Sequence, residues 1–143
     1  MTLASHLRNA NDRLADYDDA VKAERRTAAS HLFYAAEAII LAVLLSKREN
    51  LPRGQHHQLE PAAALVPDSN PIKPLLLAIT DLTQYATTFR YPTPGGRLKT
   101  AVPSKLAESA VAVRAAFHHA VKGFRVDVAS GSEVPAQSIA PLR

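Results

Sequence analysis

The chain has 143 residues, the size of one ordinary domain, with 47% hydrophobic and 21% charged residues, which excludes a disordered or collagen-like protein. It contains no cysteine, so a disulfide scaffold, a cysteine nucleophile and a thiolate metal site are excluded. The net charge of +4 is a mild basic bias that is compatible with an anionic partner but does not name one.

Four stretches have apolar residues at helical spacing, which predicts an all-α, up-down bundle of four main helices. The second stretch, from about 26 to 48, is apolar nearly all round and therefore needs neighbours on several sides. The third follows Asn70 and Pro71 and ends before Pro92, because the residue before a proline is pushed out of the α region. The three amphipathic stripes consist of Leu3, Leu7, Ala10, Leu14, Tyr17 and Val21; of Leu75, Ile79, Leu82, Ala86 and Phe89; and of Leu106, Ala110, Val113, Phe117, Val121 and Phe124.

The same patterns predict the domain organisation. A short helix is expected from Leu59 to Val66, between the second and third main helices, and one helical domain covers residues 1–126. Residues 127–143 bear Ser, Pro and Gly, are weakly patterned, and are predicted to form a C-terminal extension. The charged first thirty residues do not resemble a signal peptide, and the apolar run from Ala38 to Leu45 is too short for a membrane span. We therefore expect a cytoplasmic protein.

Motifs for metal or hydrolase chemistry are missing from the sequence. No glycine-rich phosphate loop, HExxH, EF-hand loop or GxSxG occurs. Four of the six histidines form the adjacent pairs His56-His57 and His118-His119. Adjacent side chains on a helix diverge by about 100°, so a helical pair cannot bind one ion with both rings. We expect no metal site and no cofactor, and the histidines are interpreted as surface or helix-terminal residues.

Three features are candidates for anion binding, each with a structural alternative. Glu37 lies in the most apolar stretch, where a carboxylate must be paired; it belongs either to a polar site or to a buried pair with Arg90 or a histidine. Arg90, at the end of the third helix, either caps the helix or holds a phosphate. Arg114, His118 and Lys122, four residues apart, form either a phosphate-binding strip or a solvated helix face.

Taken in chain order, the second main helix, the segment around His57, the end of the third helix and the alanine-rich last helix resemble the HEPN family (higher eukaryotes and prokaryotes nucleotide-binding domains), over roughly residues 28–124. In that family a helix with an Ala-x-Glu-Lys-Ala-like core precedes a His-x-Leu turn, and an aromatic-rich helix then ends in Arg-Tyr-Pro. The matching residues are Glu37, His57 with Leu59, and Arg90-Tyr91-Pro92.

Two departures from the family pattern concern its chemistry. Ala38 and Leu41 replace the family's lysines after the glutamate, which weakens phosphate binding by this helix. The ribonuclease branch carries Arg-x4–6-His near the start of the last helix, and this chain has Arg114 and His119 about ten residues into that helix. A five-residue step on one helix points the two side chains about 140° apart.

The resemblance implies a compact bundle that pairs as a homodimer, often beside a nucleotidyltransferase. The leading hypothesis is a non-catalytic module that binds a nucleotide or an RNA phosphate, with the second and fourth main helices near the two-fold axis. The first alternative is a metal-independent ribonuclease toxin of a toxin–antitoxin pair, in which Arg114 stabilises the phosphorane and His119 or His118 is the general acid or base. The second is an accessory subunit that only docks a partner. The ligand-binding candidates are Glu37, His57, Arg90, Tyr91, Arg114 and Lys122.

Overall fold

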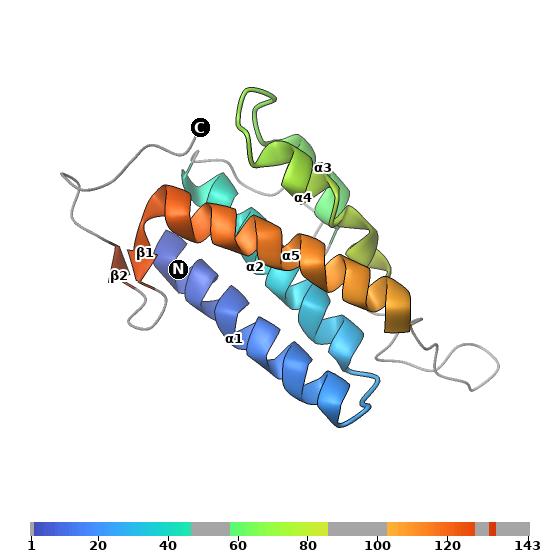
Figure 1. Cartoon of the computed structure of the whole chain (residues 1–143). Coiled ribbons are helices and arrows are strands. Elements are labelled where there is room, and N and C mark those ends of the chain that lie inside the picture. Colours follow the sequence, from blue (N-terminus) through green and yellow to red (C-terminus); the bar gives the residue numbers. More distant parts are fainter. Residues whose placement is uncertain (1, 47–57, 86–102, 128–131, 134–143) are drawn as a thin grey trace.

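The computed structural model describes residues 2–46, 58–85, 103–127 and 132–133. The described residues form a helical bundle, as predicted, in which three long helices contact one another and short helices cover one side (Figure 1). The elements in chain order are α1 (Leu3–Lys22), α2 (Ala28–Ser46), α3 (Leu59–Ala64), α4 (Lys73–Leu77), the 3-10 helix η1 (Thr80–Tyr85), α5 (Pro103–Phe124), β1 (Val126–Asp127) and β2 (Ser132–Glu133).

The central helix is α2, which contacts α1, α3, α5 and η1. It has the length and hydropathy of a membrane-spanning helix, yet 72% of its most apolar window is buried inside the fold, as expected of the core helix of a bundle. Its partly exposed edge consists of His31, Tyr34, Glu37 and Leu41. The apolar surface of α2, from which we predicted neighbours on several sides, is therefore mostly covered within one chain.

The turn from α1 to α2 is fixed by backbone hydrogen bonds and by one residue at positive φ. Thr2 caps the start of α1 by accepting from the Ser5 amide at 3.1 Å. At the other end, the Arg25 amide donates to the Ala20 carbonyl at 2.8 Å, and Glu24 adopts φ 55°. This is the Schellman arrangement, in which glycine is the usual residue at the left-handed position.

Replacing Glu24 by glycine is expected to raise the free energy of unfolding by about 0.5–1 kcal/mol, because glycine has no Cβ to strain the left-handed conformation. Glu24→Ala is the matched control, since it removes the carboxylate and keeps the Cβ. Urea denaturation followed by circular dichroism measures both variants. If Glu24→Ala raises the free energy of unfolding equally, loss of the charge and not relief of the Cβ strain explains the effect.

The third main helix differs from the prediction, because the described part of it is split into α4 and η1. Thr80 Oγ1 donates to the Leu77 carbonyl at 2.9 Å, and side-chain bonds of this kind compete with the regular helix. The Ile79 amide bonds three residues back, to Leu76, as in a 3-10 helix. Ile79 and Leu82 of the predicted stripe are buried as expected. Ala86, Phe89 and Pro92 lie outside the described residues.

The segment after α5 forms a two-residue ladder that the sequence pattern did not predict. Arg125 reverses the chain at φ 51°, and Val126 and Asp127 then pair antiparallel with Glu133 and Ser132. Both strands contact α1. The start of the predicted C-terminal extension thus rests on the bundle.

Candidate functional site

The last helix, α5, presents the basic strip predicted from spacing. Pro103 begins the helix, and its fixed φ suits the first helical turn. Arg114 is partly exposed, and His118 and Lys122 are exposed, so residues at steps of four lie on one accessible side of the helix. The opposite side is buried in the core through Leu106, Ala110, Val113, Ala116, Phe117 and Ala120.

Arg114 has an acceptor within its own chain. Its Nη2 donates to Asp18 Oδ1 of α1 at 2.5 Å, and the two side chains are 38% and 49% exposed. An exposed pair of this kind contributes at most about 1 kcal/mol, so an incoming anion can displace Asp18 at small cost. The pair also lies beside Tyr17: burial and the Asp18 charge raise the pKa of the Tyr17 hydroxyl, and Arg114 partly opposes them. The sequence pattern did not reveal Asp18 as a partner.

The two histidines of α5 have different surroundings. His118 is exposed, and its ring meets the Phe117 ring edge-to-face with centroids 5.6 Å apart. His119 is half-buried, and its Nδ1 is buried without a hydrogen-bond partner. Because α5 is a continuous helix, Arg114 and His119 keep their divergence of about 140°. Within one chain they therefore do not converge on one phosphate.

The remaining predicted ligand residues lie mostly outside the described part of the chain. Glu37 is half-buried on the partly exposed edge of α2. His57, Arg90 and Tyr91 are outside the described residues, so their predicted roles stay predictions. Of the candidate set, the structure brings together Arg114, His118 and Lys122.

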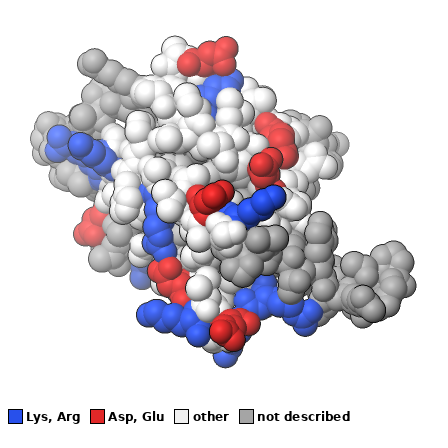
Figure 2. Space-filling view, turned by 45° about the vertical axis from the view of Figure 1, so that its right-hand side comes forward, with Lys and Arg blue, Asp and Glu red and all other residues white. Residues whose placement is uncertain are grey.

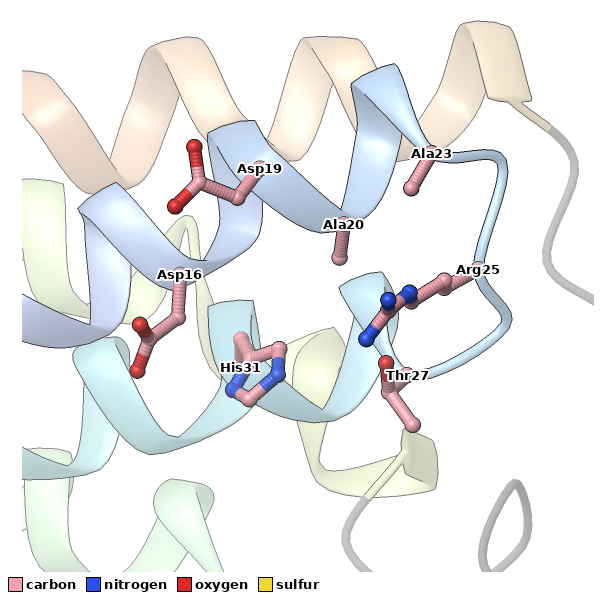
Figure 3. Close-up of a pocket in the computed structure, with 7 residues that line it drawn as sticks. All are labelled: Asp16, Asp19, Ala20, Ala23, Arg25, Thr27 and His31. Atoms are coloured by element: carbon pink, nitrogen blue, oxygen red, sulfur yellow. The ribbon is translucent and has the colours of Figure 1, made fainter.

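A surface pocket of about 450 Å³, which no sequence pattern predicted, lies at the turn between α1 and α2 (Figure 3). Asp16 and Asp19 project from α1 and His31 from α2, while Arg25 reaches from the turn toward Thr27. The three-residue spacing of Asp16 and Asp19 indicates that both carboxylates lie on one side of α1. The pocket itself could not be predicted from this spacing, because it forms only where α1 packs beside α2.

Charge decides what this pocket disfavours. Two carboxylates and one guanidinium line it, so the lining does not favour a phosphate. In the ranges that the structure describes, no three histidine, aspartate or glutamate side chains gather in a way that could hold a metal ion. One helical turn away, Arg13 lies 5.5 Å above the Tyr34 ring and 3.7 Å from Asp16. The basic strip on α5 is therefore the better anion site.

Elsewhere the charges are interspersed. On the face drawn in Figure 2, lysines and arginines alternate with acidic side chains among the described residues, and no broad area carries one sign. Binding of a long nucleic-acid duplex requires a broad cluster of cations, and no such cluster is visible on this face. A small site for one or a few phosphates fits this distribution better.

Comparison with known proteins identifies one family. The family model of the HEPN domain matches residues 3–124, from the first residue of α1 to the last of α5. No curated protein and no solved structure matches the chain. The matched range spans the helical domain and is not limited to one short motif.

Proposed function

The chain belongs to the HEPN family, and from this premise we propose that it is a module that binds a nucleotide or an RNA phosphate on α5 without cleaving it. The observation that carries the proposal is the accessible strip of Arg114, His118 and Lys122 on one side of α5. A guanidinium can donate two parallel hydrogen bonds to a phosphate, and Lys122 adds a second positive charge two turns away.

Two observations favour binding over cleavage. Arg114 is turned toward α1 by its bond to Asp18, whereas His119 is on a different side of the helix because of the five-residue step. A general acid or base must lie within hydrogen-bond reach of the reacting group. A ribonuclease would therefore need a histidine from a partner subunit to approach Arg114. A nucleotidyltransferase on another chain is the further partner that the family resemblance favours.

Replacing Arg114 by alanine is expected to weaken the binding of a short single-stranded RNA about tenfold, the loss of one charge-assisted contact. The slope of log affinity against log salt should become shallower by about 0.7, the contribution of one phosphate contact on a single strand. Fluorescence anisotropy between low and moderate salt measures both quantities, and gel analysis of the same mixtures without metal reports cleavage. RNA cutting that disappears in the Arg114 variant would overturn the non-catalytic proposal.

Removing the internal competitor should have the opposite effect. We expect Asp18→Asn to tighten RNA binding by about 1.4- to fivefold, because an exposed ion pair that the anion no longer has to break contributes about 0.2–1 kcal/mol. Asp19→Asn is the matched control, since it removes the same charge from the next, also exposed, residue. Equal gains in the two variants would mean that overall charge, and not release of Arg114, controls the affinity.

A further inference from the structure

The pocket at the turn between α1 and α2 has two ends of opposite charge. Asp16 and Asp19 lie at one end, and the guanidinium of Arg25 enters from the opposite end (Figure 3). Between the two ends lie the ring of His31 and the methyl group of Ala20. The volume of about 450 Å³ is within the range of about 300–1,000 Å³ that is typical of small-molecule sites.

The polar groups of this pocket are largely unused by the fold. The Asp16 carboxylate lies 3.7 Å from the Arg13 guanidinium, which neutralises part of its charge. No other residue that the structure describes bonds to the side chain of Asp19 or of Arg25, and both side chains are exposed. The Nδ1 atom of His31 is buried without a hydrogen-bond partner in the same ranges. A free carboxylate, a free guanidinium and an unsatisfied imidazole therefore line one cavity.

The backbone around the pocket is held by its own hydrogen bonds. The Arg25 amide donates to the Ala20 carbonyl at 2.8 Å, and the His31 amide donates to the Thr27 carbonyl at 3.0 Å. These bonds fix the turn between the two helices, so the positions from which the charged side chains extend are set before a ligand arrives. Preorganisation of this kind lowers the entropy lost on binding.

We propose that this pocket binds a small zwitterion whose ammonium and carboxylate groups are separated by a short hydrocarbon chain, as the side-chain amine and the carboxylate of lysine are. The ammonium donates to the Asp19 carboxylate, and the Arg25 guanidinium donates two parallel hydrogen bonds to the carboxylate of the ligand. The hydrocarbon chain lies over the methyl group of Ala20. An anion alone is repelled by the acidic end, and a cation alone leaves Arg25 unused.

The pocket is separate from the proposed phosphate site. It shares no lining residue with the basic strip on α5, and the lining that disfavours a phosphate is the one that suits a ligand with both charges. The inference therefore goes beyond the proposed function and does not depend on it.

The first test titrates the unaltered chain, without RNA, with three probes of about equal length. 6-Aminohexanoate carries both charges, hexylamine only the ammonium and hexanoate only the carboxylate. We expect 6-aminohexanoate to bind with a Kd of about 1 mM. Each single-charge probe should bind at least about threefold more weakly, because it lacks one of two charged contacts.

Nuclear magnetic resonance locates the binding in the same titration. The backbone amides of residues 16–31 should shift with 6-aminohexanoate. Equal affinity for the three probes, no binding at 20 mM, which is about twenty times the expected Kd, or shifts confined to other parts of the chain would overturn the proposal.

The second test assigns each charged contact. Arg25→Gln should weaken 6-aminohexanoate about threefold and leave hexylamine binding no weaker, whereas Asp19→Asn should weaken both probes. Arg26→Gln and Asp12→Asn are the matched controls, since each removes the same charge from an exposed position outside the pocket. Circular dichroism verifies that all four variants remain helical. If Arg25→Gln weakens hexylamine as much as 6-aminohexanoate, the guanidinium does not hold the carboxylate and the proposal is wrong.

The third test distinguishes two sources of the same chemistry. Free lysine and a lysine at the end of a peptide both present an amine and a carboxylate, and Nα-acetyl-lysine stands for the peptide end. Tighter binding of lysine assigns the free amino acid, and equal or tighter binding of the acetylated form assigns the peptide end. Failure of both to bind would contradict a ligand of the lysine type. Because no RNA is present, each outcome leaves RNA binding on α5 separately testable.

Discussion

Replacing Phe33 by alanine is expected to lower the free energy of unfolding by about 3–5 kcal/mol. Phe33 is fully buried on the central helix α2, which contacts α1, α3, α5 and η1. Its loss leaves a cavity, and the small alanines beside it in α2 cannot extend to fill the space. Guanidinium denaturation followed by circular dichroism measures the loss. It is a large part of the total stability of about 5–15 kcal/mol that is typical of a domain.

The neighbouring aromatic residue provides the control. Tyr34 contacts the Phe33 ring with centroids 5.2 Å apart, but it is half-buried. Tyr34→Ala is expected to cost about 1–2 kcal/mol, since water already reaches part of the ring and less apolar surface is lost. Equal losses of stability in the two variants would contradict the assignment of Phe33 to the core of the bundle.

Replacing Thr83 by alanine is expected to cost about 1–3 kcal/mol, the penalty for leaving a buried donor unsatisfied. Thr83 Oγ1 accepts from the amide of buried Leu59 at 3.0 Å and donates to Glu60 Oε2 at 3.0 Å. Gln58, at the N-cap of α3, makes no side-chain cap, so a residue of η1 caps this short helix from 24 positions away.

Thr83→Ser separates the hydroxyl from the methyl group. Serine retains both hydrogen bonds, and the stability is expected to stay within about 1 kcal/mol of the unaltered chain. Thermal unfolding compares the two variants. If serine destabilises the protein as much as alanine, the methyl contact and not the cap explains the effect.

The long helices could be predicted from the sequence because their apolar stripes are local patterns. Leu7, Leu14 and Tyr17 of α1 are buried as the spacing indicated, whereas Val21 is exposed and Ala20 takes the buried position instead. The break between α4 and η1 could not be predicted in the same way, because the apolar spacing continues through it. Local hydroxyl bonding at Thr80 and packing against α2 decide the outcome there.

The candidate site was predictable only in part, for a related reason. The strip on α5 follows from helical spacing alone, since residues four apart share a side of a helix. The bond between Asp18 and Arg114 joins residues 96 positions apart and depends on how α1 packs on α5. The pocket at the α1–α2 turn likewise needs two helices in register. Information of this kind is absent from any single stretch of sequence.

If Arg114 binds a phosphate as proposed, its bond to Asp18 makes the affinity depend on ionic strength in a second way, through the protein itself. Both side chains are exposed, so dissolved ions screen their attraction, over about 10 Å at 0.1 M salt. Salt should therefore weaken the proposed RNA binding and, at the same time, weaken the bond of Asp18 that competes with it. The advantage of an Asp18 variant over the unaltered chain should be largest in dilute buffer and should vanish as salt rises. At the proposed site the Asp18 carboxylate would act as a tethered anion whose effective concentration is set by the fold, and the affinity would then change less with the surrounding electrolyte.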